Sequence, residues 1–426
     1  MGNQDFPQDI QEPGTGMQFI TNLPLRHRIG KIWVLIFQLA MVIGIAALAA
    51  LILNIVNDST GYMAYTAKID PLDLTGGRPL ESLTSEELNQ ILVENTTINR
   101  YKTIFKEKPL EEWSQPELLE AVVRDVVKLT VLKTWSFTES LKGIARLRQE
   151  LIELKPKEGP DASFLYKTWI TSRFLSSPQN SDPLLAGLKT AILGSLWIIG
   201  ITLLFAIPIG IGAAIYLEEF ANQELWINKL IQTNINNLAA VPSIIYGMLG
   251  LTIFVRWLGP ITSGSVFGVG DPNVVNGRTI FSGGLTLGLL VLPIVIINSQ
   301  EAIRAVPSSL RQAGYGLGAT KLQTIWAHVL PNAIPGILTG TILALSRAFG
   351  ETAPLIVVGV STFITVDPSN VFSQFTSLPA QIYQWTAKPQ DVWRNLAAAA
   401  IIALMVLLLA LNALAIFLRN KYSKEY

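Results

Sequence analysis

The chain has 426 residues, of which 50% are hydrophobic and 15% are charged. Soluble chains usually carry about 25% charged residues, so this composition indicates a membrane protein. The formal net charge of +1 provides no basic field for nucleic acid, and the lack of cysteine excludes disulfides, thiolate metal sites and cysteine nucleophiles. The two histidines, His27 and His328, leave little material for histidine-based catalysis. We therefore predict a non-catalytic chain without a metal site.

Six stretches of the sequence are apolar over the roughly 20 residues that a helix needs to cross a bilayer. In chain order, the predicted spans are residues 32–56, 190–217, 230–255, 279–300, 329–366 and 395–418. Basic residues near these spans are more frequent on the side that holds both termini, so we expect both termini to be cytoplasmic. The predicted fold class is an all-α integral membrane protein with six transmembrane helices.

The start of the chain offers two interpretations. Arg26, Arg28 and Lys31 form a basic flank of the kind that precedes the apolar part of a signal peptide. That apolar part is about 7–15 residues long in signal peptides, and the run here is longer. We therefore interpret residues 26–56 as a retained first transmembrane helix. Residues 1–25 contain prolines and glycines without periodicity and are predicted to be a disordered cytoplasmic tail.

Residues 57–182 differ from the rest because they hold more than half of the charged side chains. Helix starts are predicted at Ser85, Ser114 and Thr138, each followed closely by glutamate. We expect an extracytoplasmic helical insertion, since long loops cross a membrane largely regardless of charge. It is either an insertion without chemistry of its own, which we favour, or a docking surface for a solute-binding protein.

Residues 183–420 are predicted to form a core of five transmembrane helices, followed by a cytoplasmic tail at 421–426. Glycines one helical turn apart let membrane helices approach closely. Two such pairs occur, Gly284 with Gly288 and Gly336 with Gly340. Prolines fall inside three of the spans, at Pro208, Pro242 and Pro293. These prolines predict kinks, either from ordinary packing or in a bundle that bends between two openings.

The segment 301–335 is too long and too regular for a simple turn between two spans. Ser308 and Ser309 can cap a helix over residues 310–315, and helical character resumes over residues 319–328. Glycines are crowded between the two helices, at Gly314, Gly316 and Gly318. We predict a helix, a small-residue elbow and a second helix at the cytoplasmic membrane surface, where another protein can approach the backbone closely.

This segment resembles the EAA loop of ABC importer permeases, the binding-protein-dependent importer family. The matching residues are Gln312-Ala313-Gly314, Gly318 and Leu330-Pro331. Gln312 stands where the family has glutamate, and His328 stands where it has an aliphatic residue. The resemblance implies a coupling helix that docks into a separate ATPase. The coupling residues are then Gln312, Ala313, Gly314, Gly318, Ala319, Thr320 and Lys321.

The glycine cluster could also be interpreted as a nucleotide-binding loop. Gly314, Gly316 and Gly318 lack the GxGxxG spacing, and the pattern G-x-x-x-x-G-K-[ST] occurs nowhere in the chain. We therefore expect this chain to bind no cofactor. ATP and Mg²⁺ are expected on the partner ATPase.

A charged pair, Arg347 and Glu351, interrupts the apolar stretch 329–366. Arg347 lies about 16 Å along the helix from Gly336, at about 1.5 Å per residue, which predicts a position near mid-membrane. An arginine there costs about 2.5–3.5 kcal/mol, so it needs a partner or a function. The pair is either a structural salt bridge or a substrate pathway in which the guanidinium meets an anion. Phosphate carries an O–H that Glu351 can accept, whereas sulfate carries none.

Several stretches of the core resemble the PstA family of phosphate ABC importer permeases. They are Gly212 to Glu219, Asn237 to Gly247, Arg304 to Ser308, Gly318 to Lys321 and Ser346 to Pro354. The resemblance implies phosphate import across a bacterial inner membrane and a pathway role for Arg347 and Glu351. It also implies a PstC-like sister permease, an ATPase dimer and an extracytoplasmic phosphate-binding protein. Two alternatives stay open: a permease for molybdate or sulfate, and an ion-coupled secondary carrier.

Overall fold

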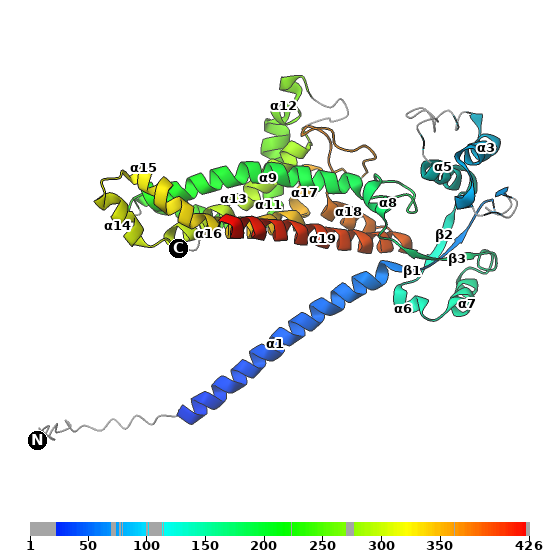
Figure 1. Cartoon of the computed structure of the whole chain (residues 1–426), viewed down its shortest axis with the longest axis horizontal. Coiled ribbons are helices and arrows are strands. Elements are labelled where there is room, and N and C mark those ends of the chain that lie inside the picture. Colours follow the sequence, from blue (N-terminus) through cyan, green and yellow to red (C-terminus); the bar gives the residue numbers. More distant parts are fainter. Residues whose placement is uncertain are drawn as a thin grey trace, which may run out of the picture. The chain divides into compact units, whose positions relative to one another are not determined.

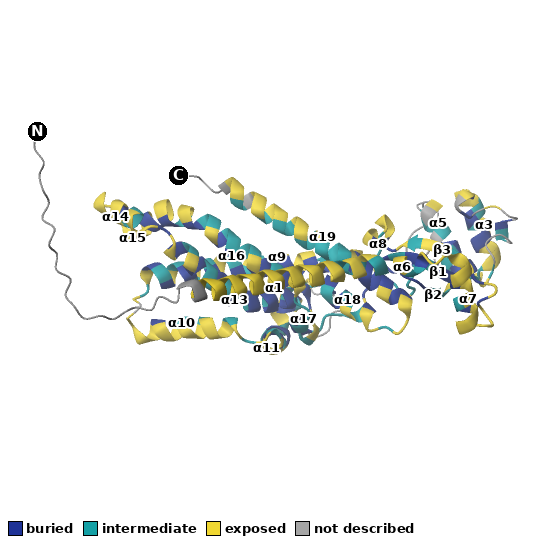
Figure 2. Ribbon diagram, turned by 90° about the horizontal axis from the view of Figure 1, so that it is seen from below, coloured by how far each residue is buried: buried dark blue, intermediate teal, exposed yellow. Residues whose placement is uncertain are grey.

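The computed structural model describes residues 23–422 apart from gaps at 70–73, 76–77, 79, 99–100, 102–112, 114, 223, 270–276 and 362. Residues 23–25 and 421–422, which the sequence assigns to the tails, are helical, and the rest of both tails lies outside the described residues. The chain divides into two compact units, Met1–Asn54 and Ile55–Tyr426. Helix α1 (Leu23–Asp58) lies mainly in the first unit, and all of its residues from Arg26 to Leu51 are exposed (Figure 2).

The second unit contains the helical core and the insertion (Figure 1). The core elements are α9 (Lys189–Ile215), η4 (Tyr216–Phe220), α10 (Trp226–Ala239), α11 (Ser243–Gly250), η5 (Leu251–Trp257), α12 (Gly259–Thr262), η6 (Ser265–Phe267), α13 (Ile280–Arg304), α14 (Ser308–Gly316), α15 (Lys321–Thr324), η7 (Ile325–Val329), α16 (Leu330–Gly350), α17 (Ala353–Val358), α18 (Leu378–Thr386) and α19 (Asp391–Tyr422).

Five helices among the described residues are long and apolar enough to cross a membrane. They are Arg26–Asp58, Lys189–Phe220, Ile280–Arg304, Lys321–Gly350 and Asp391–Lys421. A sixth candidate, formed by α10 with α11 and η5, is bent by 106° at its break. The predicted span at 230–255 is therefore not one continuous helix: it is broken at Pro242, where the sequence predicted a kink. Pro242 has no amide hydrogen and disfavours helical backbone at the preceding residue, so the helix ends there.

The predicted span at 329–366 is also displaced in the structure. Its helix begins at Lys321 and ends at Gly350, and the short helix α17 follows. Thr320 starts the helix because its side chain accepts the backbone N–H of Gln323, and the Gln323 side chain accepts that of Thr320. Pro354 stands just beyond the end, where a helix usually stops. The fold class itself is confirmed: the core is a bundle of long apolar helices.

Helix α13 is central in the core and packs against both α9 and α16. A Cβ atom at Gly284 would lie 2.6 Å from the Ile201 side chain on α9, and one at Gly340 would lie 2.4 Å from the Asn298 side chain on α13. The predicted role of the paired glycines is thus confirmed, because only a glycine lets these backbones come so close. Pro208 and Pro293 lie inside α9 and α13 without breaking them.

The insertion contains strands that the sequence did not predict. Its elements are β1 (Thr60–Thr66), η1 (Leu80–Ser82), α3 (Ser85–Asn95), α5 (Gln115–Val122), η3 (Val123–Val127), β2 (Thr130–Thr134), α6 (Phe137–Ser140), α7 (Ile144–Leu154), β3 (Ser163–Thr168) and α8 (Ser172–Ser176). The strands form an antiparallel sheet in the order β2-β1-β3. The prediction of a helical insertion was therefore incomplete.

Local signals explain which helices of the insertion were found. Thr84 and Glu87 form a capping box at the predicted start of α3. The start predicted at Ser114 falls on a residue outside the described part. The helix predicted from Thr138 is instead two helices, α6 and α7, since Gly143 between them has a φ of +84° that helical backbone does not adopt.

The insertion is joined to the core by shared packing. Met63 on β1 and Trp169 after β3 belong to the same buried cluster as Trp385 and Trp393 of the core. The Thr134 hydroxyl also donates to the side chain of Asn395 at the start of α19, at 2.6 Å. Figure 1 places the sheet at one end of the long core helices and the α14–α15 hairpin at the other.

Candidate coupling and pathway sites

The α14–α15 hairpin occupies the predicted coupling loop. Helix α14 covers the predicted helix at 310–315 and begins two residues earlier. The predicted second helix at 319–328 is not separate, because α15, η7 and α16 form one continuous helix from Lys321 to Gly350. Pro331 and Pro335 lie inside this continuous helix, near the start of α16, and do not end it. The hairpin is thus attached directly to a candidate membrane span.

The elbow between the two helices depends on two of the predicted glycines. Gly318 has a φ of +81°, a left-handed conformation that costs other residues energy. Gly314 is buried within α14, where a Cβ atom would lie 2.8 Å from the Thr324 hydroxyl oxygen. Gly318 therefore sets the turn, and Gly314 lets α14 pack against the start of the next helix.

The remaining predicted coupling residues lie on the surface of the hairpin or at its turn. Gln312 and Ala313 are exposed on α14, and Ala319 is half-buried in the turn. Thr320 caps the next helix, and the Lys321 ammonium lies 5.3 Å from the centre of the Phe220 ring. The structure thus brings all seven predicted residues into one hairpin.

The tip of the hairpin also exposes apolar side chains that the sequence reasoning did not single out. Leu317 is 89% exposed at the elbow, and Leu322 and Trp326 are exposed on the helix that follows. Large apolar side chains that project from a turn are typical of surfaces that bind another protein. Of the three, only Leu317 lies among the elbow glycines, between Gly316 and Gly318, and that position was its signal in the sequence.

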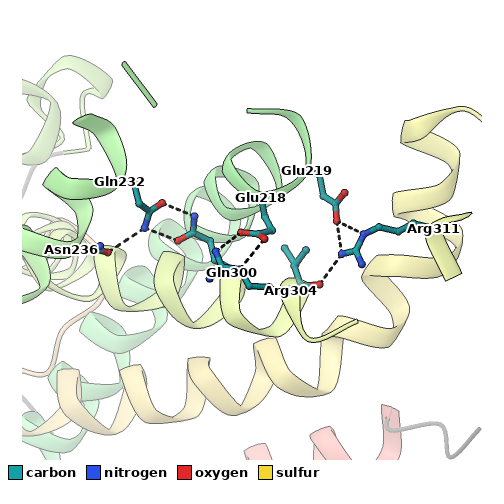
Figure 3. A network of polar contacts seen from close by, with 8 residues as sticks. Glu218, Glu219, Gln232, Asn236, Gln300, Arg304 and Arg311 are labelled. Atoms are coloured by element: carbon teal, nitrogen blue, oxygen red, sulfur yellow. Dashed lines mark hydrogen bonds and ion pairs between the residues drawn. The ribbon is translucent and has the colours of Figure 1, made fainter. Parts of the chain in front are cut away.

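Two arginines hold the base of the hairpin to η4, the element that continues α9. Arg304, the last residue of α13, donates two hydrogen bonds to the Glu218 carboxylate, at 3.0 and 2.8 Å (Figure 3). Arg311 on α14 donates two to Glu219, at 3.0 and 2.7 Å (Figure 3). Bidentate and charge-assisted contacts of this kind are among the strongest hydrogen bonds in proteins.

The Arg311 pair is the more buried of the two. The side chains of Arg311 and Glu219 are 18% and 7% exposed, whereas Arg304 is 65% exposed. Arg311 also donates to the backbone carbonyls of Ile303 and Val306, at 2.9 and 2.7 Å. It therefore holds the carboxylate and closes the turn between α13 and α14. Glu218 and Glu219 lie in a stretch that resembles the PstA family, but the sequence predicted no role for them.

A second link joins α10 to α13 beside these ion pairs. The Gln232 and Gln300 side-chain amides exchange hydrogen bonds in both directions, at 3.2 and 2.8 Å (Figure 3). A cavity of about 590 Å³ opens next to them, lined by polar groups that include Asn228 and Lys229. The end of the bundle that carries the hairpin is thus tied together by a chain of polar contacts from α10 to α14.

The predicted pathway pair lies at the other end of α16. Arg347 is in the last turn of this helix, and Glu351 follows the helix end in extended backbone. The Arg347 Nε atom lies 3.8 Å from Glu351 Oε1, and the two side chains are 47% and 21% exposed. Since the helix ends before Glu351, the pair lacks the geometry of two residues one helical turn apart. The structure brings the two residues together, but loosely.

The chain around this pair stays inside the bundle. Helix α17 follows Glu351 after one residue and packs against α11 and α13. A Cβ atom at Gly247 on α11 would lie 2.7 Å from the Pro354 Cα atom. On the other side, the Ser346 hydroxyl donates to the Asn412 side chain on α19, at 2.8 Å. The pair therefore sits at a break between two helices that neighbouring elements hold in place.

The described residues contain no group of three or more histidine, aspartate or glutamate side chains arranged to hold a metal ion.

Comparison with known proteins places the chain in a family. Residues 206–424 match the family described as the binding-protein-dependent transport system inner membrane component. The chain belongs to this family, the membrane-embedded components of transport systems that depend on a binding protein. Both the hairpin and the Arg347–Glu351 pair lie in the matched part, whereas the insertion lies outside it.

Individual relatives are similar over about half of the chain. A protein named phosphate transport system permease protein PstA, from Xylella fastidiosa, is 34% identical over 237 residues, 55% of this chain and 76% of that protein. The probable ABC transporter permease protein YqgI of Bacillus subtilis is 30% identical over 234 residues, 52% of this chain and 73% of that protein.

A third relative and one solved structure extend this comparison. The phosphate transport system permease protein PstC of Pasteurella multocida is 35% identical over 210 residues, 45% of this chain and 61% of that protein. A chain of the MetNI methionine ABC transporter, solved in inward-facing conformations, aligns with 57% of this chain and all of its own length, at 15% identity and a TM-score of 0.41. The family assignment rests on the sequence matches.

Proposed function

We propose that this chain is the permease subunit of an ATP-driven importer that moves inorganic phosphate into the cytoplasm. The observation that carries the proposal is the similarity of its core to several proteins named phosphate transport system permease. Membership of a binding-protein-dependent family supports an extracytoplasmic binding protein as a partner. A sister permease and an ATPase dimer complete the proposed assembly in a bacterial inner membrane, with both termini of this chain in the cytoplasm.

In this proposal the α14–α15 hairpin docks into the ATPase. Its exposed elbow presents Leu317 together with the small residues around Gly318. The ion pairs of Arg304 and Arg311 then carry movements of the docked hairpin to α9 and α13, since both carboxylates belong to η4, which continues α9, and Arg304 is the last residue of α13. The chain itself performs no catalysis, and ATP and Mg²⁺ bind to the ATPase.

The Arg347–Glu351 pair is the proposed contact with phosphate. At 3.8 Å the two side chains are held less tightly than a direct charge-assisted hydrogen bond would hold them. An anion can therefore replace Glu351 as the partner of the guanidinium without breaking a strong bond. A phosphate that still carries a proton can donate it to the Glu351 carboxylate, whereas sulfate leaves that carboxylate unpaired.

Uptake by proteoliposomes tests the function directly. The complete complex should accumulate radioactive phosphate only with ATP inside the vesicles, and the permeases without the ATPase should accumulate none. Uptake without the ATPase would favour the ion-coupled carrier instead. An excess of sulfate or molybdate should leave phosphate uptake nearly unchanged, and strong competition by either anion would favour the oxyanion alternative.

A further inference from the structure

Helix α10 belongs to a candidate membrane span, yet its two flanks differ in polarity. Thr233 and Asn236 line the cavity of about 590 Å³ that opens beside α13. The opposite flank exposes Ile231 and Leu238, which are 39% and 42% exposed. Asn234, also on that flank, donates to the carbonyl four positions earlier in its own helix, at 2.7 Å. Since polar side chains within a span usually face protein or a water-filled cavity, the lining of this cavity indicates water.

A row of amides connects the polar flank of α10 to α13. The Gln232 side chain exchanges hydrogen bonds with Gln300 and also donates to the Asn236 oxygen, at 3.2 Å (Figure 3). Asn236 accepts this bond through its oxygen, and its amide nitrogen carries two further donors. Amide groups are uncharged, so they bind an anion more weakly than an arginine does. The wall along α10 thus offers an anion weak hydrogen bonds that exchange easily.

Positive charge lies at the end of the cavity that is next to the hairpin. Arg304 holds the Glu218 carboxylate there with two hydrogen bonds, and Lys229 lines the same cavity. The Lys229 ammonium lies 3.6 Å from the Glu224 carboxylate, and the two side chains are 63% and 88% exposed. Exposed ion pairs of this kind contribute little to stability. Lys229 can therefore exchange Glu224 for an anion that reaches this end.

Helix α10 also extends from this end toward the Arg347–Glu351 pair. It has 14 residues and covers about 21 Å, at about 1.5 Å per residue. At its far end, the Tyr246 hydroxyl on α11 donates to the Leu238 carbonyl, at 2.7 Å. Helix α11 in turn packs against α17, which follows Glu351 after one residue. The polar flank of α10 therefore runs between the hairpin end and elements that adjoin the pair.

We propose that this cavity is the cytoplasmic part of the phosphate path, and that Thr233 and Asn236 line it. The inference rests on the proposed function, since it describes where phosphate goes after it leaves Arg347. A path must bind its ion well enough to admit it and weakly enough to release it. The uncharged donors along α10 meet this requirement, and Lys229 attracts the anion toward the cytoplasm.

Single cysteines test whether the polar flank faces water, because the chain has no cysteine of its own. Thr233→Cys and Asn236→Cys place a thiol on the polar flank. Ile231→Cys and Leu238→Cys are the matched controls, each two residues away on the opposite flank. The complete complex in nanodiscs is treated with a water-soluble methanethiosulfonate that bears a sulfonate, and mass spectrometry follows the modification of this chain.

The thiols on the polar flank should react about tenfold or more faster than their controls, because the reactive thiolate forms in water and not in an apolar environment. Co-purified ATPase and the thermal unfolding temperature show whether each variant is assembled and folded. Equal rates on the two flanks, or faster reaction of the controls, would overturn the proposal.

The charge of the label tests whether an anion passes Asn236. In proteoliposomes, the sulfonate label on Asn236→Cys should lower phosphate uptake about tenfold or more, since a like charge in the path repels phosphate. A trimethylammonium label of similar size should lower uptake clearly less, and dithiothreitol should restore it by removing either label. Equal losses from both labels, or no loss from either, would overturn the path.

The same measurements separate the path from the proposed function. A complex with native residues that takes up no phosphate would overturn the proposed function and this inference with it. A complex that takes up phosphate equally well before and after the sulfonate label is attached to Asn236→Cys would overturn the path alone.

Discussion

Two arginine–carboxylate pairs in this chain differ in almost every physical respect. Glu219 is buried and Arg311 is mostly so, the two share two hydrogen bonds as short as 2.7 Å, and Arg311 also donates to two backbone carbonyls. Arg347 and Glu351 approach to 3.8 Å through a single contact, and the arginine is 47% exposed. The first pair joins α14 to η4, whereas the second lies at a break after α16.

This difference indicates a structural role for the first pair and a role in transport for the second. A tight, buried pair costs much to open and so keeps its two elements together. A long contact with a half-exposed arginine contributes little to stability, which leaves the arginine available for another anion. We therefore assign the assembly of the hairpin to Arg311 and contact with the substrate to Arg347. Variants at Arg311, Glu351 and Arg347 test this assignment, and variants at Gly318 and Gln312 test the dock that the hairpin forms.

Arg311→Gln should have the largest effect. It leaves the Glu219 carboxylate buried without its partner, at a cost of about 3–5 kcal/mol. We expect a markedly lower thermal unfolding temperature in detergent and loss of the co-purified ATPase. Arg304→Gln is the matched control: Arg304 is 65% exposed while its partner Glu218 is 11% exposed, so water can partly replace the arginine and the loss should be smaller than that of Arg311→Gln.

The double variant Glu219→Gln with Arg311→Gln separates charge from packing. Removing both charges should recover much of the stability that Arg311→Gln loses, since no unpaired charge is then buried. If Arg304→Gln were as damaging as Arg311→Gln, burial would not be what distinguishes the two pairs.

Glu351→Gln should change selectivity more than stability. An uncharged amide does not repel an anion that carries no proton. Sulfate should therefore inhibit phosphate uptake at a concentration about tenfold lower, or lower still, than in the wild type. The measurement is the sulfate concentration that halves phosphate uptake in proteoliposomes, with Glu351→Asp as the control that keeps the carboxylate. An unchanged sulfate concentration in Glu351→Gln would remove the proposed role of this carboxylate.

Gly318→Val should weaken docking by a smaller amount. No atom lies within 4 Å of a Cβ at this position, so the effect comes from the backbone φ of +81°. A non-glycine residue there costs about 1–2 kcal/mol, and a β-branched one is the least suited. Co-purified ATPase should fall several-fold. Gly318→Asn is the control, because asparagine tolerates left-handed backbone better than valine does. If both variants lost the same amount of ATPase, the cause would be the presence of any side chain at the elbow and not the backbone conformation.

Gln312→Ala should have the smallest effect on transport. Gln312 is exposed on α14 and carries no charge, so its loss removes at most one neutral contact with the ATPase. Uptake should fall less than it does in Gly318→Val. A larger loss from Gln312→Ala would show that the dock depends on this side chain rather than on the elbow.

The sequence predicted the parts of the molecule that depend on local patterns. Apolar runs located the candidate spans, and glycine pairs such as Gly284 and Gly288 marked close helix contacts. The hairpin followed from the spacing of Gly314 and Gly318 with Leu330-Pro331, a pattern that needs no knowledge of distant residues. The prediction that Arg347 and Glu351 line the substrate pathway stays untested.

The parts that the sequence did not predict depend on contacts between distant residues. Strand β1 pairs with β3 through residues about a hundred positions later, and seven residues carry too little periodicity to predict a strand. Arg311 and Glu219 are 92 positions apart, so nothing local indicated that they meet. The break at Pro242 could have been inferred from the proline, but kinked and broken spans share that signal.

The most direct test measures phosphate uptake per co-purified ATPase for Arg347→Gln in the complete complex. The tight pair at Arg311 is intact in this variant, so the amount of ATPase and the unfolding temperature should match the wild type. Uptake should fall about tenfold or more, because a hydrogen bond to a charged partner is worth about 1.5–3 kcal/mol. Undiminished uptake with intact assembly would contradict the account, and would leave Arg347 and Glu351 as no more than a weak salt bridge.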